Sequence, residues 1–178
     1  MGIIEERRSV RKYTDEVVDK ETLNKIIKSS SFAPSWANTQ IARYNIVESP
    51  ELINEIRTRG VNDFVYNVKV LDKAKQVMVL TIKKGKSGKL KEGDEYATGK
   101  AGDWEVFDAG IACQTFCLAA HENGVGTVIM GVIDDKEIAD IINLPEDESV
   151  AALVVFGYPN ETPKTPPRLS VEEISRFM

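Results

Sequence analysis

The amino-acid sequence predicts an α+β domain with a small sheet and one dominant buried helix. Short apolar runs typical of strands are mixed with amphipathic stretches typical of helices, in no regular βαβ repeat. The segment from Trp104 to Asn123 is apolar around nearly its whole circumference, as expected of a helix that is buried on every side. No turn of the GxGxxG or GxxxxGK[ST] type occurs, which argues against a Rossmann or P-loop site.

Length and charge limit the classes of function. A chain of 178 residues suits one domain, covering 1–178. Its net charge is −5, so we expect no nucleic-acid partner. No apolar run approaches the ~20 residues of a membrane span, and the first residues lack the apolar core of a signal peptide. We therefore expect a cytoplasmic protein with no membrane partner.

The N-terminal stretch from Arg7 to Tyr13 is unusually basic for this acidic chain. It holds four cations and the hydroxyl of Ser9. The guanidinium group presents a planar fork of donors that suits phosphate. The residues alone leave two interpretations open, a pocket for a phosphate monoester and a solvated basic arm.

A helix and a polar loop follow. Apolar residues recur at helical spacing within 14–31, after Thr14 and Asp15, and the serines at 29–31 with Pro34 end that helix. The loop at 33–40 is rich in side-chain amides and hydroxyls and leads into a strand at 43–47. Polar loops of this kind commonly bind ligands.

The next elements are apolar. A helix runs from Ser49 and Pro50 to Gly60, and 64–71 is apolar except for Asn67 and Lys69. The near-continuous apolar run at 76–82 predicts a strand that is buried on both faces.

Residues 83–103 interrupt this pattern. The segment has five glycines, several lysines and almost no core-forming residues. It predicts a mobile excursion, and the alternatives of a lid or interface arm and of plain disorder both stay open.

The C-terminal half begins with the long apolar helix. We interpret its Cys113, Cys117 and His121 as packing residues and expect no metal site, because the chain has one histidine and no second cysteine pair. Strands are expected at 126–131 and 149–156, with a helix after Asp134 between them. A proline-rich tail and a short helix that includes Phe177 end the chain.

Taken end to end, the sequence resembles the nitroreductase family of FMN-dependent oxidoreductases. The resemblance lies in RRSVRKY, APSWANTQ, DAGIACQTFCLAAHENGVGT, VIMGVID, LPEDESVAALVVFGYP and PKTPPR, in that order. It implies a three-layer fold, with a small mixed sheet between helices and a long central helix at a dimer interface. It also implies a homodimer in which both subunits build each FMN site.

The resemblance implies an activity as well. Electrons would pass from NADH or NADPH through FMN to a small flat acceptor, such as a nitroaromatic or a quinone, by a ping-pong mechanism. The alternatives are a flavin-dependent dehalogenase, a flavin-fragmenting relative, and a non-catalytic flavin-binding redox sensor. The acceptor and the choice between NADH and NADPH stay open.

The resemblance finally implies the residues that bind FMN. Matches to the phosphate and ribityl contacts are Arg7, Arg8, Ser9, Arg11 and Arg168. Matches to the loop that lines the partner's flavin ring are Pro34, Ser35, Trp36 and Asn38. Matches near the ring's pyrimidine edge and beside the flavin are Asn67, Lys69, Met130 and Gly131. Because the flavin carries the chemistry, no catalytic side chain is expected.

Overall fold

The computed structural model describes residues 2–90 and 94–178. Its centre is a sheet of four strands in the order β1-β2-β4-β3. Their bounds are β1 Ala42–Val47, β2 Gln76–Lys83, β3 Gly126–Met130 and β4 Glu148–Gly157. All three ladders are antiparallel. The prediction of a mixed sheet was therefore wrong, and within the described ranges the one parallel pairing is an isolated bridge between Ser9 and Thr127, outside the ladders of the sheet.

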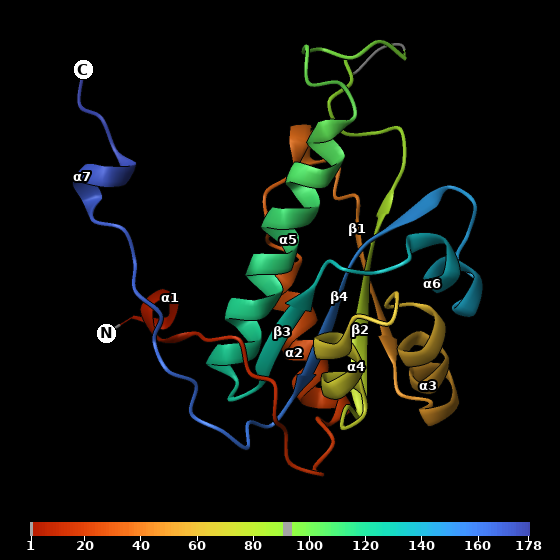
Figure 1. The fold of residues 1–178 in the computed structure, drawn as a ribbon. Coiled ribbons are helices and arrows are strands. Elements are labelled where there is room, and N and C mark those ends of the chain that lie inside the picture. The colour runs from red at the N-terminus through yellow and green to blue at the C-terminus, as the bar shows by residue number, and fades with distance from the viewer. Residues whose placement is uncertain (1, 91–93) are drawn as a thin grey trace.

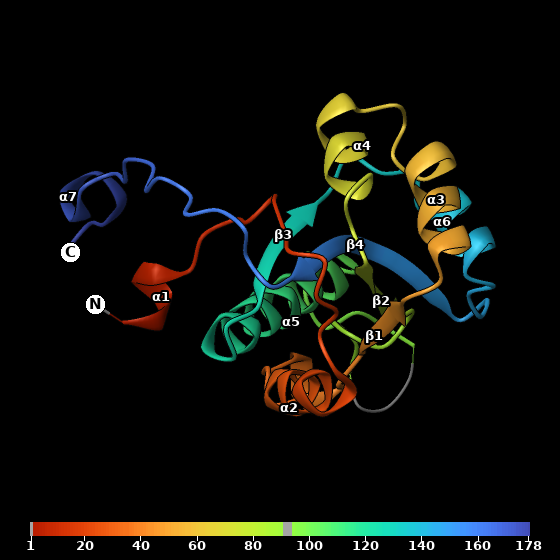
Figure 2. The ribbon, with the colours of Figure 1, turned by 90° about the horizontal axis from the view of Figure 1, so that it is seen from below.

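Helices cover both faces of the sheet. α2 (Lys20–Ser30) and α5 (Asp103–Glu122) lie on one face, and α3 (Pro50–Arg59), α4 (Val65–Leu71) and α6 (Asp135–Ile141) lie on the other (Figures 1 and 2). Each face has its own cluster of buried apolar side chains. The predicted three-layer α+β fold is therefore confirmed.

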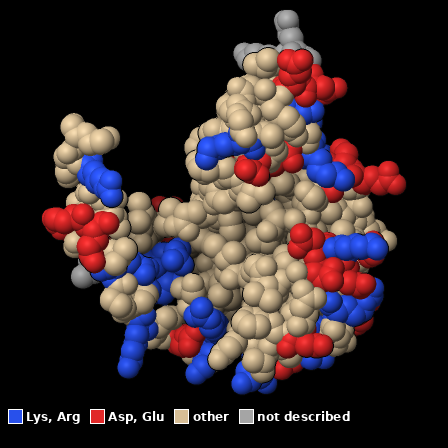
Figure 3. Space-filling view, turned by 45° about the horizontal axis from the view of Figure 1, so that its top comes forward, with Lys and Arg blue, Asp and Glu red and all other residues tan. Residues whose placement is uncertain are grey.

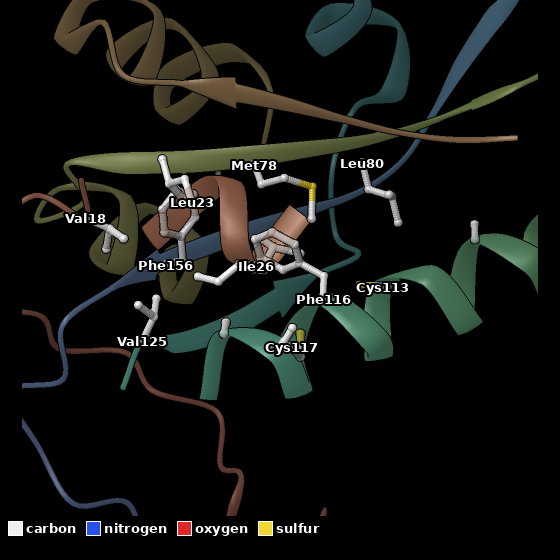
Figure 4. Packing of buried hydrophobic residues seen from close by; sticks show 14 of the residues in the cluster. Val18, Leu23, Ile26, Met78, Leu80, Cys113, Phe116, Cys117, Val125 and Phe156 are labelled. Carbon is white, nitrogen blue, oxygen red and sulfur yellow. The ribbon is translucent and has the colours of Figure 1, made fainter. Parts of the chain in front are cut away.

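The core beneath α5 is built from aromatic and aliphatic side chains. Phe116 of α5 meets Phe156 of β4 edge to face at 6.1 Å and stacks on Tyr44 of β1 at 5.8 Å between ring centroids. Ile26 and Met78 point into the same layer from α2 and β2 (Figure 4). Removing each such side chain from water contributes roughly 1.5–3 kcal/mol to folding. Strand β2 is buried on both faces, as its apolar run predicts.

The two cysteines lie in this core. Cys113 and Cys117 are both buried and neither forms a disulfide. The hydrogen bond to Cys117, together with burial, raises the pKa of Cys113. These positions agree with the interpretation of both thiols as packing residues.

Several predicted helix boundaries were wrong. The first long helix begins only at Lys20, where the Asp19 carboxylate caps it by accepting a hydrogen bond from Thr22 N at 2.9 Å. Thr14 instead donates its backbone N–H to Tyr158 O at 2.9 Å, so this stretch is extended. The last helix, α7, is only Val171–Ile174 and leaves Phe177 beyond its end.

Helix α5 is not buried on every side within one chain. Ala112, Cys113 and Phe116 face the sheet and are buried, whereas Val106 and Phe107 are 70% and 59% exposed. Of the two interpretations of its all-round apolar sequence, a central helix within one chain is therefore wrong, and packing against a second subunit stays a prediction. The sheet can cover only one face of a helix, and nothing in the described chain covers the other.

Both ends of the chain project from the body. α1 (Ile3–Glu6) and α7 lie on the same side, away from the sheet (Figure 2). Among the described residues, no helix is long and apolar enough to cross a membrane.

Candidate functional site

The segment from Ser9 to Thr14 is fixed across the ends of β3 and β4. Val10 N donates to Thr127 O at 2.9 Å. Gly126 permits this approach, because a Cβ atom there would lie 2.8 Å from the Val10 side chain. The Tyr13 hydroxyl donates to Val10 O at 2.5 Å and lies 3.1 Å from Val155 O, and burial raises the pKa of Tyr13. The backbone that carries the basic side chains of this segment is therefore held in a defined position.

The C-terminal tail returns to the same segment. One Glu161 carboxylate oxygen accepts hydrogen bonds from Arg11 N at 2.7 Å and from Lys12 N at 3.2 Å. The Arg8 guanidinium donates to Thr165 Oγ1 from Nε at 3.2 Å and from Nη2 at 2.8 Å. The two ends of the chain are thus joined by side chains.

A cationic pocket of about 400 Å³ lies between these two ends. It is lined by Arg7, Arg8, Ser9, Arg11, Pro163, Lys164, Thr165, Pro166 and Arg168. No carboxylate is among these residues, and Figure 3 shows basic side chains gathered beside the projecting segments. Clustered guanidinium and hydroxyl donors suit a phosphate monoester. The structure therefore brings together all five residues predicted for the phosphate.

The five do not have equal freedom. The Arg8 guanidinium already donates hydrogen bonds to Thr165 and, through Nη1, to the carbonyls of Glu5 and Arg7 at 2.6 and 2.8 Å. Arg168 makes no hydrogen bond or ion pair within the described ranges. Arg8 therefore fastens the tail, whereas Arg168 can turn its donors to a ligand.

A second pocket, of about 580 Å³, opens at the end of β3. Arg11 lines both this pocket and the cationic one, so the two adjoin at this residue. Asn67 of α4, Met130 and Gly131 line it together, as predicted. Asn67 is buried and donates through Nδ2 to Val132 O at 2.9 Å, which fixes its amide. The residues predicted to contact the ring therefore lie beside those predicted to contact the phosphate.

Lys69 lies elsewhere. It is exposed and lines a third, basic pocket rather than the one that contains Asn67. The two residues are two positions apart on α4, and at about 100° per residue a helix turns them to different sides.

The polar loop predicted to contact the flavin lies apart from these pockets in the same chain. Pro34 and Ser35 line a cavity of about 230 Å³ between α2, β1 and α5. Trp36 and Asn38 are in a short 3₁₀ turn, Trp36–Asn38. Ala37, Asn38 and Gln40 have φ of 44°, 58° and 49°, a left-handed conformation that surrounding contacts must maintain.

Asp108 provides those contacts. This buried carboxylate of α5 accepts hydrogen bonds from Trp36 N at 3.1 and 3.0 Å and from Ser87 Oγ at 2.6 Å. Trp36 Nε1 also donates to Lys89 O at 2.9 Å, and the Trp36 ring lies 4.8 Å from that of Trp104. Part of the predicted 83–103 excursion is therefore anchored to the loop, while 91–93 lie outside the described residues.

Sequence reasoning missed three residues that organise these sites, namely Asp108, Glu161 and Thr165. Asp108 carried a signal, because a carboxylate inside an otherwise apolar helix is found buried only when it has hydrogen-bond partners. Glu161 and Thr165 act from 150 and 157 residues away in the sequence, and no local pattern indicates such contacts.

Comparisons with known proteins show the family to which the chain is similar. The family model described as "Nitroreductase family" matches residues 4–158. The solved structure of an FMN-dependent nitroreductase from Clostridium difficile R20291 has 30% sequence identity to this chain and a TM-score of 0.73, and the match covers 93% of this chain and 91% of that one. An FMN reductase [NAD(P)H] of Bacillus subtilis is 26% identical over 96% of this chain and 70% of its own length. An iodotyrosine deiodinase of Thermotoga neapolitana is 26% identical over 95% of this chain and 93% of its own.

Proposed function

The chain belongs to the nitroreductase family, and we propose that it is an FMN-dependent oxidoreductase that uses NADH or NADPH to reduce a small flat acceptor, such as a nitroaromatic or a quinone. The observation that carries the proposal is that two pockets adjoin at Arg11, one cationic and free of carboxylates, the other lined by Asn67, Met130 and Gly131. When bound, FMN would supply the redox chemistry between the dinucleotide and the acceptor.

In this proposal the chain binds the phosphate from both of its ends. Arg7, Ser9, Arg11 and Arg168 contact the phosphate and ribityl chain, while Arg8 holds the tail in place through Thr165. A phosphate monoester carries about two negative charges at neutral pH. Charge-assisted hydrogen bonds from guanidinium groups stabilise that charge more strongly than neutral donors would.

The ring is oriented by the second pocket. Asn67, whose amide is fixed by its hydrogen bond to Val132 O, would hold one edge of the ring, and the backbone at Met130 and Gly131 would line it. Arg11 places a positive charge between ring and phosphate, which favours negative charge on the ring. No acid or base from a side chain is required for this part of the reaction.

We infer that a second copy of the chain completes the site. The exposed face of α5 carries Val106, Phe107 and Gly110, and nothing lies within 4 Å of a Cβ atom built on Gly110. A second α5 can approach closely at such a residue and bury the apolar side chains. The loop with Pro34, Ser35, Trp36 and Asn38 then lines the partner's flavin ring, which accounts for its distance from the pockets of its own chain. In this view 1–178 form one FMN-binding domain, with 83–103 as a lid or interface arm.

Dehalogenation is the alternative that a specific observation favours, because the matched deiodinase aligns over 95% of this chain. Both activities require the same flavin site. They differ in the acceptor, so the residues around FMN do not separate them.

The test is anaerobic addition of NADH or NADPH to purified, yellow holoprotein. The proposal predicts bleaching of the flavin absorption, followed by its recovery when a nitroaromatic or a quinone is added. No bleaching with either dinucleotide would identify a flavin-binding module instead. Recovery with 3-iodotyrosine, and not with the nitro compound or quinone, would assign the dehalogenase.

A further inference from the structure

A third pocket, of about 730 Å³, borders the proposed flavin site and has a strongly basic lining. The cations around it are Arg11, Lys12, Lys69, Lys73 and Lys75. The carboxylates around it are Asp15 and Asp72. In a chain with a net charge of −5, this concentration of positive charge is local.

The two carboxylates are already paired. Asp15 lies 3.4 Å from Lys75 Nζ, and Asp72 lies 3.4 Å from an Arg57 nitrogen. Across 2–90 and 94–178, no carboxylate forms an ion pair with Lys12, Lys69 or Lys73. Three ammonium groups therefore face one pocket without partners, and their mutual repulsion favours an anionic occupant.

The pocket adjoins the proposed flavin-ring pocket. Arg11, Tyr66 and Val70 line both of them. The backbone beneath the first two cations is fixed, because Glu161 accepts hydrogen bonds from Arg11 N and Lys12 N, and Asn160 N donates to Lys12 O at 2.9 Å. A ligand whose anionic group lies in this pocket can therefore extend into the neighbouring flavin-ring pocket.

We infer that this basic pocket binds the phosphates of the reducing dinucleotide. The inference rests on the proposed function, in which a dihydronicotinamide ring must lie against the flavin. In NADH and NADPH that ring is joined through one ribose to a pyrophosphate, so the phosphates fall in the space beside the flavin pocket. Lys69, predicted to contact FMN, lines this pocket. Ammonium groups bind phosphate as point charges, so flexible lysines suit a substrate that must leave after each turnover.

The test uses the variant Lys12→Gln/Lys73→Gln, which changes neither the FMN-phosphate pocket nor the ring pocket. The rate of anaerobic flavin bleaching is followed against the concentration of whichever dinucleotide reduces the wild type faster. We expect the half-saturating concentration to rise about tenfold or more, since one lost charge-assisted contact is worth roughly that factor. The matched control is Lys28→Gln/Lys136→Gln, which removes the same charge from α2 and α6, and its half-saturating concentration should stay at the wild-type value.

A second donor separates this inference from the proposed function. N-benzyl-1,4-dihydronicotinamide gives a hydride but has no phosphate, so it should reduce the flavin of the variant as well as that of the wild type. Inorganic pyrophosphate should compete with the dinucleotide in the wild type and not with the benzyl donor. An unchanged half-saturating concentration for the dinucleotide, or an equal loss with both donors, would overturn the inference. Failure of the benzyl donor to bleach the wild type would instead count against the proposed function.

Equilibrium binding gives a readout that is independent of turnover. The oxidised dinucleotide, NAD⁺ or NADP⁺, is titrated into oxidised holoprotein and its Kd is measured by calorimetry. The Lys12→Gln/Lys73→Gln variant should bind it about tenfold more weakly, with a smaller dependence on salt concentration. Equal Kd values at low salt would contradict the assignment.

Discussion

Arg8 and Thr165 join the two ends of the chain, because the guanidinium donates two hydrogen bonds, of 3.2 and 2.8 Å, to one threonine hydroxyl 157 residues away. The pocket proposed for the FMN phosphate lies beside this contact. Its cations come from both ends, so the pocket exists only while the tail is docked. Arg8 therefore has a structural task that its neighbours in the basic stretch do not share.

Replacing Thr165 with Val should release the tail without removing a charge. We expect faster limited proteolysis within 162–170 and a loss of about 1 kcal/mol in the free energy of unfolding, as is typical for an exposed hydrogen-bonded pair. Ser175→Ala is the control, because the Ser175 hydroxyl bonds only within the tail, to Val171 O. Equal cleavage rates for the two variants would show that Thr165 does not hold the tail.

Replacing Asp108 with Ala should loosen the polar loop at 33–40. The change leaves Trp36 N and Ser87 Oγ without their acceptor, so we expect a loss of about 2–3 kcal/mol in the free energy of unfolding. The chain has two tryptophans, Trp36 and Trp104, and their rings are in contact at this loop. Tryptophan emission should therefore shift to longer wavelength.

The conservative variant Asp108→Asn keeps one acceptor oxygen and should recover most of the wild-type emission. If Asp108→Ala leaves both the emission maximum and the unfolding free energy unchanged, Asp108 does not position the loop.

Replacing Val106 with Glu should disrupt the proposed dimer and leave the fold intact. Val106 is 70% exposed in one chain, so the charge harms only a contact with another copy. Light scattering after size exclusion should give about 19.8 kDa for the variant and twice that for the wild type. Val17→Glu is the control, an exposed position away from α5, and should stay dimeric. A charge at Cys113 is a poorer test, because Cys113 is buried against the sheet.

Stability should fall at alkaline pH in a way that depends on Tyr44. Burial raises the pKa of Tyr44 to about 12 from the ordinary value of 10.0. Between these values the unfolded chain has released the proton and the native chain has not, so the unfolded state is favoured as pH rises. The melting temperature of Tyr44→Phe should therefore fall less from pH 9.5 to 11.5 than that of the wild type. Parallel curves for the two proteins would contradict the assignment.

The sequence was most informative where periodicity and composition are local properties. The apolar run of β2 and the all-round apolar α5 gave the positions of the two elements that form the centre of the fold. Periodicity was less reliable at the ends of helices, because a single capping side chain can determine where a helix begins. Asp19 starts α2 because its carboxylate caps Thr22 N, and the preceding Thr14 and Asp15 offer a similar pattern without forming a helix.

The candidate site was predictable in its residue types and not in its contacts. The basic stretch alone left a phosphate pocket and a solvated arm both open, and only the family resemblance joined Arg168 to it. Nothing in the sequence pairs Arg8 with Thr165. Lys69 and Asn67 looked equivalent in sequence, but the turn of α4 sends them to different pockets. Contacts of this kind depend on the tertiary fold, which brings together residues that no short motif connects.

The most direct test of the central claim is the affinity for FMN of the variant Arg7→Gln/Arg168→Gln. This variant loses one guanidinium from each end of the chain. Since each charge-assisted contact is worth roughly tenfold, the Kd for FMN should rise by about a hundredfold or more. The purified protein should be folded and colourless. Lys28→Gln/Lys136→Gln, with the same change in charge, should stay yellow. Full FMN content in the arginine variant would contradict the assignment of the cationic pocket to the FMN phosphate.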